Sequence, residues 1–272
     1  MNLLLCVLAV ATLSILSYVV ISAAVGFRGF YEPVPLTDAR PRIVVSLSTL
    51  PSRIDNIDAV IRSINDNTMR PDAIYVNVPT YSKREQRDYH IPPKLHAIDN
   101  VIVNRIDTDY GPVTKLYPTL ENEIDPETII ICIDDDHQYD SDLINNLVER
   151  SNTYPDSAIC LSGWNYVNLG AFALPLRFHV NNVVQKVKVL QCYNGVLYRR
   201  KFFDDSFDGY IRLKECFTVD DILISKYLND NDVDILSIPY NFKHKSLTYE
   251  QDVSPLCLFN LKNNSWIKCI NA

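Results

Sequence analysis

Residues 129–140, IIICIDDDHQYD, join a run of β-branched hydrophobic residues directly to three consecutive aspartates. The apolar run, residues 129–133, is typical of a buried strand in a parallel sheet. The aspartates, residues 134–136, follow at the C-terminal end of that strand, where ligands bind in open α/β sheets. Because adjacent carboxylates repel one another unless a cation or a protein base neutralises them, the stretch predicts a metal or charged-ligand site. The alternative is that Asp140 or Ser141 caps the following helix.

The hydrophobic pattern predicts that strands and helices alternate along the chain. Strands are expected at residues 42–50, 73–78, 101–106, 128–134, 157–163, 186–192, 195–200 and 234–240. Helices are expected at residues 54–66, 113–123, 141–151 and 220–230. This alternation favours an α/β fold with a mostly parallel sheet, in one domain from about residue 41 onward.

The composition is that of an ordinary globular protein: of 272 residues, 47% are hydrophobic and 22% are charged. The net charge of -7 and the pI of about 5.2 argue against nucleic acid as the main partner, because binding to backbone phosphates needs a basic face. The seven glycines do not have the spacing of a dinucleotide-binding fingerprint or of a P-loop. A typical NAD enzyme and a Walker-type NTPase are therefore disfavoured.

The N-terminal segment differs from the rest in composition. Leu3–Val25 contains no charged residue, and about 20 apolar residues span a bilayer as a helix. Since this segment is longer than a signal-peptide core and no basic region precedes it, we expect a single-pass transmembrane signal anchor at residues 1–26. Residues 27–41, with three prolines, form the expected stalk, and residues 42–272 the globular domain.

The sequence leaves open on which side of the membrane the domain lies. Three arginines, residues 28, 40 and 42, follow the predicted span, whereas the only positive charge before it is the amino terminus. Because positively charged flanks tend to stay in the cytosol, this difference favours a cytosolic globular domain. Four of the seven cysteines have the opposite implication if they pair, because disulfides form in oxidising compartments, but their spacing does not demand pairing. They are Cys192, Cys216, Cys257 and Cys269.

Five segments, spread over most of the chain after the anchor, carry polar or charged residues beside predicted elements. They are VVSLSTLPSRI (44–54), DTDYGPVTKLYP (107–118), IIICIDDDHQYD (129–140), YNGVLYRRKFF (193–203) and VDDILISKYL (219–228). Together they resemble the ordered landmarks of the GT-A fold glycosyltransferases with a DxD-type motif, in a group found in bacteria and large DNA viruses. The resemblance implies a Rossmann-like α/β sandwich that binds a nucleotide-sugar and a divalent cation, Mn²⁺ or Mg²⁺.

The resemblance gives the aspartates separate roles. A nucleoside diphosphate leaving group gains negative charge as the glycosidic bond breaks, and a hard cation held by oxygen ligands can neutralise it. By resemblance to the DxD motif, Asp134 contacts the ribose or the sugar, and Asp136 binds the metal. Asp135 is also acidic and could take either role. If the strand pleat continues, Asp134 and Asp136 point to one side and Asp135 to the other.

The residues after the first strand are expected to form the nucleoside pocket. Ser48 and Thr49 offer hydroxyl groups beyond the strand end, and Arg53 offers a planar fork to a phosphate or a base. The alternative is that this segment only caps the following helix, through Ser52 or Asp55.

The segment at 107–118 is expected to face the diphosphate. Gly111 and Pro112 form a tight turn that sets Lys115 on the first turn of the next helix, and Asp109 precedes this turn. The resemblance makes Asp109 and Lys115 donor-binding candidates. An exposed salt bridge is the alternative for Lys115.

An acidic pair, Asp220 and Asp221, opens a predicted helix. A sugar hydroxyl is a poor nucleophile, so an inverting transfer needs a carboxylate within hydrogen-bond reach as general base. The resemblance implies an acid that faces the acceptor here, and we predict that Asp221 is this base, with Asp220 as the second candidate. The alternative is that Thr218 or Asp220 caps the helix and Asp221 only interacts with the helix dipole.

Three further residues are site candidates. His244 follows the last predicted strand, where many GT-A enzymes have a histidine that binds the metal. Asn194 and Gly195 lie in a turn near aromatic residues and are candidates for the acceptor side, because sugar faces stack on aromatic rings.

The sequence thus predicts a membrane-anchored, metal-dependent glycosyltransferase. It would transfer a sugar from a nucleotide-diphosphate sugar, with UDP as the expected nucleotide, to a glycan or glycoconjugate acceptor. Clustered aspartates also suit a metal-dependent phosphohydrolase, which usually needs further ligands for a second ion. A catalytically inactive, membrane-anchored glycan-binding module is the other alternative, but it would relax the acidic pairs.

Overall fold

The structure, a computed structural model, describes residues 40–168, 173–176, 183–241, 243–247 and 256–272. The predicted anchor at residues 1–26 and the stalk up to residue 39 lie outside the described residues. Within the described part of the chain, no helix is both long enough and apolar enough to cross a membrane.

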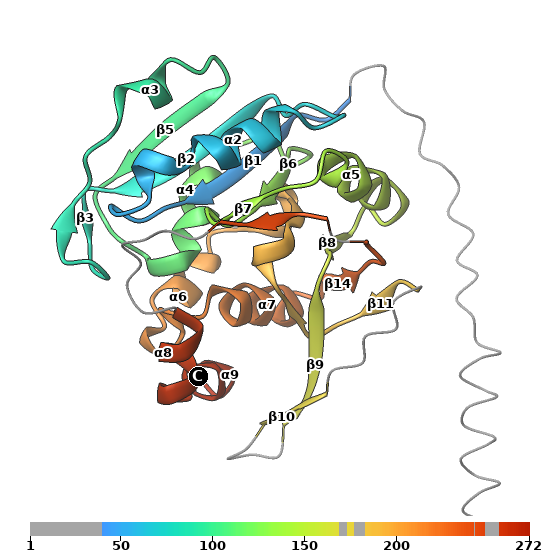
Figure 1. The fold of residues 1–272 in the computed structure, drawn as a ribbon. Coiled ribbons are helices and arrows are strands. Elements are labelled where there is room, and N and C mark those ends of the chain that lie inside the picture. Colours follow the sequence, from blue (N-terminus) through green and yellow to red (C-terminus); the bar gives the residue numbers. More distant parts are fainter. Residues whose placement is uncertain (1–39, 169–172, 177–182, 242, 248–255) are drawn as a thin grey trace, which may run out of the picture. The chain divides into compact units, whose positions relative to one another are not determined.

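An eight-stranded sheet forms the centre of the fold, in the order β11-β14-β8-β13-β6-β1-β2-β5 (Figure 1). Six strands run in one direction: β1 (Ile43–Ser48), β2 (Ala73–Pro79), β5 (Val101–Ile106), β6 (Ile129–Cys132), β8 (Ser157–Cys160) and β14 (Asp234–Ser237). The two antiparallel strands are β11 (Gln185–Lys186) at the edge and β13 (Val196–Arg199) between β6 and β8. The predicted α/β fold with a mostly parallel sheet is confirmed.

Helices cover both faces of the sheet, because its central strands are apolar on both sides. Along β6, Ile129 and Ile131 belong to one buried cluster, and Ile130 and Cys132 to the other. The helices on the first face are α2 (Asp58–Asn65), preceded by η1 (Ile54–Asn56), α3 (Pro93–His96) and α5 (Leu143–Thr153). Those on the second face are η2 (Gly111–Lys115), α4 (Tyr117–Asn122), α6 (Phe207–Ile211) and α7 (Asp220–Asp230).

Several short elements lie outside this sandwich. A three-stranded sheet consists of β9 (Gly163–Asn168), β10 (Ala173–Leu176) and β12 (Val189–Leu190). Two small pairs are β3 (Tyr81–Ser82) with β4 (Arg87–Asp88), and β7 (His137–Gln138) with β15 (Lys245–Ser246). Short 3-10 turns are η3 (Cys192–Asn194), η4 (Arg200–Phe202) and η5 (Lys214–Cys216).

Two predicted strands are divided in the structure. The strand expected at 157–163 ends at Cys160, and β9 begins at Gly163; the strand expected at 186–192 becomes β11 and β12, which belong to different sheets. Gly163 explains the close approach of β9 and β12, since a Cβ atom there would lie 2.6 Å from the Val187 side chain and 2.9 Å from the Val189 carbonyl oxygen.

Two short helices, α8 (Leu256–Asn263) and α9 (Ser265–Ile270), pack beside α6 and α7 at the C-terminal end of the chain (Figure 1). A disulfide between Cys216 and Cys269 joins η5 to α9. Of the four cysteines whose pairing the sequence left open, Cys192 is a buried free thiol and Cys257 an exposed one.

Candidate functional site

Polar residues from several elements meet at the C-terminal edge of the parallel strands. Thr49 and Arg53 follow β1, and residues 134–136 follow β6. Because β13 runs in the opposite direction and pairs Val196 with Cys132, the turn before it, residues 194–195, comes to the same edge. η2 packs against both β1 and α7, which brings the start of α7 to the site.

The three aspartates have different surroundings. The Asp135 carboxylate points toward β1, where it accepts hydrogen bonds from Thr49 Oγ1 (2.6 Å) and from Arg53 Nη1 (2.8 Å). The Asp135 side chain is 8% exposed, whereas those of Asp134 and Asp136 are 30% and 33% exposed. Part of each carboxylate of Asp134 and Asp136 is therefore accessible to solvent, while Asp135 holds the guanidinium of Arg53.

Neighbouring charges set the ionisation of these carboxylates. Burial works against the charge of Asp136, but the hydrogen bond to His137 (2.7 Å) and the charges of His137 and Arg53 outweigh it and lower the pKa of Asp136. Burial raises the pKa of Asp135, against the opposing effect of Arg53. Asp136 is thus ionised at neutral pH and able to attract a cation.

Lys115 connects the aspartates to the start of α7. It is buried, and its Nζ forms an ion pair with Asp134 and lies 3.1 Å from Asp220 Oδ2. Burial opposes its charge, but the carboxylates of Asp134 and Asp220 raise the pKa of Lys115 well above its usual value. The exposed salt bridge that was the alternative for Lys115 is therefore not what the structure contains.

The turn before Lys115 requires a glycine. Gly111 has φ +72°, and a Cβ atom there would lie 2.3 Å from the Phe217 carbonyl oxygen. The other end of η2 is held by Ser46 Oγ, which donates to the carbonyl oxygen of Lys115 (2.5 Å). These two contacts fix Lys115 between β1 and the segment that leads into α7.

Two other donor-side candidates lie at the margin of the site. Asp109 accepts hydrogen bonds from the backbone N–H groups of Gly111 (2.7 Å) and Lys83 (2.8 Å), so its carboxylate shapes the turn. Ser48 is the half-buried last residue of β1.

Asp220 and Asp221 open α7, as the sequence predicts. Asp221 Oδ1 accepts a hydrogen bond from the backbone N–H of Cys192 (2.9 Å). Burial, followed by the charge of Asp220, raises the pKa of Asp221 to about 7, although the charge of Lys115 acts in the other direction. A carboxylate with such a pKa is suited to take up a proton near neutral pH.

Helix capping does not account for the acidic residues. The described N-termini of α2, α5 and α7 have no side-chain cap hydrogen bond. Thr218 Oγ1 donates to Asn260 Oδ1 (2.6 Å), and Asp140 Oδ2 accepts from the backbone N–H of Lys243 (2.9 Å). These two of the capping candidates thus contact other parts of the chain.

The chemistry of the donor atoms indicates where a metal fits. In the described residues, one group of three possible ligands has its atoms within 4.8 Å of one another: Cys192, Asp220 and Asp221. Burial raises the pKa of the Cys192 thiol well above its usual value, so this sulfur is protonated. Asp134 and Asp136 offer oxygen ligands, which Mg²⁺ and Mn²⁺ prefer. By the chemistry of its donor atoms, the Asp134–Asp136 pair thus fits a hard cation.

His244 lies behind Asp136, with His137 between them. The pairing of β7 with β15 brings the rings of His137 and His244 to a centroid distance of 4.9 Å, and His137 Nδ1 lies 2.7 Å from Asp136 Oδ1. Burial, followed by the charge of His137, lowers the pKa of His244. A neutral imidazole is the form that binds metals.

Tyr139 links the aspartates to the acceptor-side turn, and the sequence reasoning missed it. Its hydroxyl accepts a hydrogen bond from the backbone N–H of Asp134 (2.9 Å) and donates to the carbonyl oxygen of Tyr193 (2.9 Å). Tyr139 is almost fully buried. The available signal was a tyrosine five residues after the first aspartate, since a buried tyrosine hydroxyl needs a polar partner.

Asn194 and Gly195 lie in the turn that follows Tyr193. Asn194 is buried and donates to Ser162 Oγ (2.7 Å), while its Oδ1 has no hydrogen-bond partner among the described residues. Gly195 has φ +99°, and a Cβ atom there would lie 3.2 Å from Leu143. The glycine thus lets this turn pass close to α5.

No protein-family model and no curated protein matches the chain. Among solved structures, the fold is similar to TarS of S. aureus. A crystal structure of TarS residues 1–349 in complex with UDP-GlcNAc aligns with a TM-score of 0.53 and 13% identity, over 85% of this chain and 67% of that one. At this identity, the similarity shows a shared fold.

Two further TarS structures align less completely. Another structure of residues 1–349 has a TM-score of 0.49 and 12% identity, over 76% of this chain and 60% of that chain. A longer TarS structure has a TM-score of 0.49 and 12% identity over 76% of this chain, which here spans 37% of the TarS chain.

Proposed function

We propose that this chain is a metal-dependent glycosyltransferase that uses a nucleotide-diphosphate sugar, UDP-linked, and a glycan or glycoconjugate acceptor. The main support for this proposal is the arrangement of charged side chains at one edge of the sheet. Two partly exposed carboxylates, Asp134 and Asp136, lie between the buried cations Lys115 and Arg53, beside the acidic pair of α7. Binding of a diphosphate donor needs positive charge, and removal of the proton from an acceptor hydroxyl needs a carboxylate.

The donor would bind over the ends of β1 and β6. Arg53, held by Asp135, can offer its remaining N–H groups to a phosphate or a base. Lys115 is charged, and contacts at both ends of its turn fix its backbone. It can therefore contact the diphosphate without a further loss of conformational freedom. The shared fold with TarS, whose structure contains UDP-GlcNAc, supports a nucleotide-sugar as the ligand.

Asp134 and Asp136 would hold the metal, with His244 as a further candidate ligand. When bound, a divalent cation supplies Lewis-acid stabilisation of the leaving diphosphate. The chain's own residues prepare this binding: His137 and Arg53 keep Asp136 ionised, and Lys115 forms an ion pair with Asp134. The hydrogen bond from the backbone N–H of Asp134 to the Tyr139 hydroxyl fixes the main chain at the first of these two aspartates.

Asp221 would act as the base that accepts the proton of the acceptor hydroxyl. Its Oδ1 accepts a hydrogen bond from Cys192, and this bond orients the carboxylate relative to the turn at Asn194. The raised pKa gives Asp221 enough basicity to take up a proton at neutral pH. Asp220 is held by Lys115, and this ion pair makes it the weaker candidate.

Membrane attachment is part of the same proposal. The uncharged segment Leu3–Val25 supports a single-pass anchor at residues 1–26, with residues 27–41 as a stalk before the catalytic domain. The disulfide between Cys216 and Cys269 supports an oxidising compartment, although the arginines after the span favour the cytosol.

A screen of nucleotide-sugars tests the proposed function. The full chain, purified in detergent, is incubated with UDP- and GDP-sugars, with Mn²⁺, Mg²⁺ or EDTA, and release of the nucleoside diphosphate is measured. We expect metal-dependent release from one donor and none with EDTA. Release of inorganic phosphate from simple phosphate esters would favour the phosphohydrolase instead. Donor binding without any turnover would favour the glycan-binding module.

A further inference from the structure

α8 carries an exposed apolar surface. Leu258, Phe259 and Leu261 are 58%, 51% and 67% exposed, and we call them the α8 apolar face. Other large exposed hydrophobic side chains among the described residues are spread over several elements. Three large apolar side chains exposed on one helix indicate a surface that has a partner.

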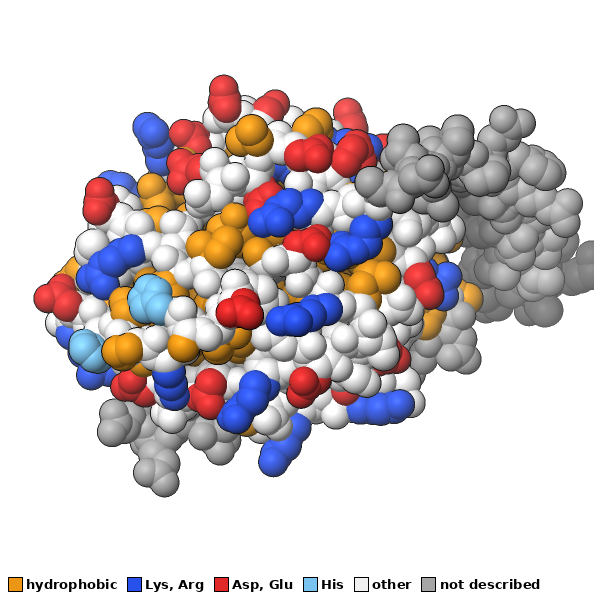
Figure 2. Space-filling view, turned by 90° about the horizontal axis from the view of Figure 1, so that it is seen from above, with side chains coloured by type: hydrophobic (Ala, Val, Ile, Leu, Met, Phe, Trp, Pro, Cys, Tyr) orange, Lys and Arg blue, Asp and Glu red, His pale blue; other side chains and the backbone are white. Residues whose placement is uncertain are grey.

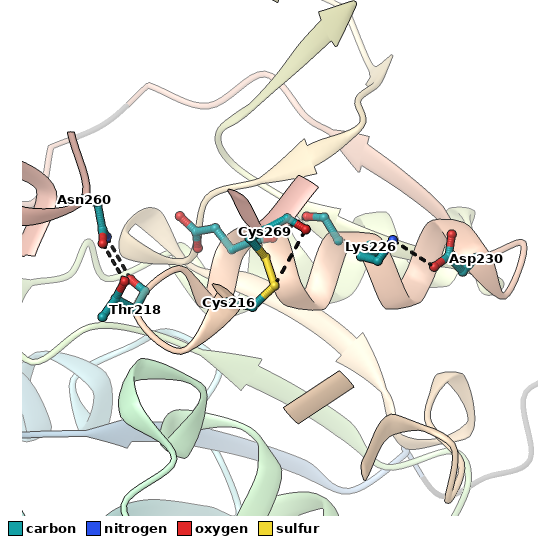
Figure 3. Close-up of a disulfide and its surroundings, with 8 residues drawn as sticks. Cys216, Thr218, Lys226, Asp230, Asn260 and Cys269 are labelled. Carbon is teal, nitrogen blue, oxygen red and sulfur yellow. Dashed lines mark hydrogen bonds and ion pairs between the residues drawn. A yellow bond between two sulfur atoms is a disulfide. The ribbon is translucent and has the colours of Figure 1, made fainter. Parts of the chain in front are cut away.

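The polar side of α8 faces the protein. Asn260 Nδ2 donates to the Thr218 carbonyl oxygen (2.8 Å), and Thr218 Oγ1 donates to Asn260 Oδ1 (2.6 Å), as Figure 3 shows. A surface helix of a water-soluble protein normally has the opposite orientation, with its apolar side toward the core. In α8 the asparagine binds the domain and the α8 apolar face points away from it.

The C-terminal segment is basic in an acidic protein. Leu256–Ala272 contains Lys262 and Lys268 and no aspartate or glutamate, whereas the whole chain has a net charge of -7. Both lysines are exposed. On the face of the molecule seen in Figure 2, by contrast, acidic and basic side chains are interspersed. A helix with exposed Leu and Phe beside lysines is the composition of segments that lie in the interface of an anionic bilayer.

The segment is firmly attached to the domain. The disulfide between Cys216 and Cys269 lies directly beside the Thr218–Asn260 contact (Figure 3). Both cysteines are buried. The α8 apolar face is therefore presented on a fixed support.

The predicted anchor explains why a bilayer is the expected partner. Residues 27–41 span at most about 50 Å when fully extended, so a chain anchored through residues 1–26 keeps its domain next to the membrane. A domain held there meets the bilayer far more often than it meets a dilute protein partner.

We propose that α8 lies in the membrane interface, with Leu258, Phe259 and Leu261 among the lipids and Lys262 and Lys268 near anionic head groups. This contact is separate from the N-terminal anchor. It would orient the domain, because α8 is bound to Thr218, two residues before the acidic pair of α7. The choice of a bilayer rests on the membrane anchor of the proposed function, and not on the identity of the reaction.

The exposed thiol of Cys257, on α8 itself, provides the probe for the test. The full chain with Cys6→Ser is labelled at Cys257 with a fluorophore and reconstituted in phosphatidylcholine vesicles that contain phosphatidylserine. We expect quenching by lipids that carry a spin label on their acyl chains, and a several-fold lower quenching by aqueous iodide than in detergent. A label on Asp99→Cys, in a Cys6→Ser/Cys257→Ser background, is the control and should stay accessible to iodide.

Substitution of the exposed side chains separates this contact from the alternatives. Leu258→Ser/Phe259→Ser/Leu261→Ser should abolish lipid quenching at Cys257 without changing the unfolding temperature, since these side chains are already exposed. Unchanged lipid quenching in this variant would overturn the proposal. Energy transfer between labelled copies, without lipid quenching, would replace the bilayer by a second copy. Equal shielding from iodide in detergent and in vesicles, again without lipid quenching, would point to cover by the chain's own N-terminal segment and also overturn it.

Discussion

The contacts of Asp135 could be predicted from the sequence only in part. The strand pleat predicted that Asp135 points to one side and its two neighbours to the other. In the structure Asp135 is the most buried of the three and binds Arg53 and Thr49, but Asp136 Oδ2 also lies 3.5 Å from Arg53 Nη1, so these two carboxylates reach the same guanidinium. The contact with Arg53 joins residues 82 positions apart. Local pattern carries no information on such a pair, so the support of Arg53 by Asp135 could not be predicted.

Asp136→Ala tests the metal assignment. The variant should lose most Mn²⁺-dependent binding of UDP, because it removes an ionised oxygen ligand from a partly exposed position. Titration calorimetry with UDP, with and without Mn²⁺, measures this loss. Asp99→Ala, which removes an exposed carboxylate elsewhere, should bind like the unchanged chain. Equal affinity of both variants would refute the assignment of Asp136.

Asp221→Asn tests the base. Asparagine keeps the shape of the side chain and can still accept the hydrogen bond from Cys192, but it cannot take the acceptor's proton. Turnover should therefore fall by roughly 10²- to 10⁴-fold while donor affinity stays unchanged. Steady-state kinetics with the acceptor and calorimetry with the donor measure the two effects. Normal turnover would shift the role to Asp220, for which Asp220→Asn is the matched test.

The raised pKa of Asp221 predicts two pH dependences. Turnover should rise with pH and reach half its maximum near pH 7, because only the ionised carboxylate accepts a proton. Stability changes in the opposite direction: between the usual value of 3.8 and about 7, the folded state holds a proton that the unfolded state releases, so rising pH destabilises the fold. Urea unfolding should show Asp221→Asn gaining stability relative to the unchanged chain across this window. A constant difference between the two would contradict the shift.

At the scale of elements, η2 and α7 together form the charged centre of the site. The Gly-Pro turn predicted that Lys115 lies on the first turn of the next helix. The φ of +72° at Gly111 agrees with a tight turn, but Lys115 is the last residue of η2, and α4 begins two residues later at Tyr117. The ion pair of Lys115 with Asp220 depends on how η2 packs against α7, and the sequence contains no pattern for this packing. The sequence therefore located both motifs but not their contact.

Lys115→Met tests this contact between elements. Loss of the ammonium leaves Asp134 and Asp220 without their shared cation, and removing one partner of such a buried pair destabilises a fold by about 3 kcal/mol. Urea unfolding at neutral pH measures the loss. Lys115→Met/Asp220→Asn should recover part of the stability, and no recovery would argue against the ion pair as the cause.

Across the whole molecule, the elements that depend on neighbouring residues were predicted, whereas those that depend on distant segments were not. The central strands β1, β2, β5 and β6 were predicted within one or two residues, because each is a short apolar run with polar ends. The small strands β7, β9 and β15 were missed, and the strand expected at 186–192 was divided into β11 and β12. Most of these strands have two residues, and only pairing with distant segments forms them. The C-terminal helices were missed for a related reason, since α8 has its apolar side outward.

The disulfide between Cys216 and Cys269 covalently joins two segments that are far apart in the sequence. Four candidate cysteines allow three ways of forming two pairs, so the sequence could not choose this bond. It joins residues 53 positions apart, and the chain-entropy model gives about 4 kcal/mol for a loop of this length.

Cys216→Ala/Cys269→Ala should therefore lower the free energy of unfolding by up to about 4 kcal/mol, measured by urea unfolding of the full chain in detergent. Treatment of the unchanged chain with dithiothreitol should have the same effect, because it opens the same loop. Cys257→Ala, which changes an exposed free thiol on the neighbouring helix, should leave stability unaltered. If the double variant unfolds like the Cys257→Ala control, the bond does not constrain the fold, and the attachment of α8 and α9 to the segment before α7 then rests on the Thr218–Asn260 hydrogen bonds and on packing alone.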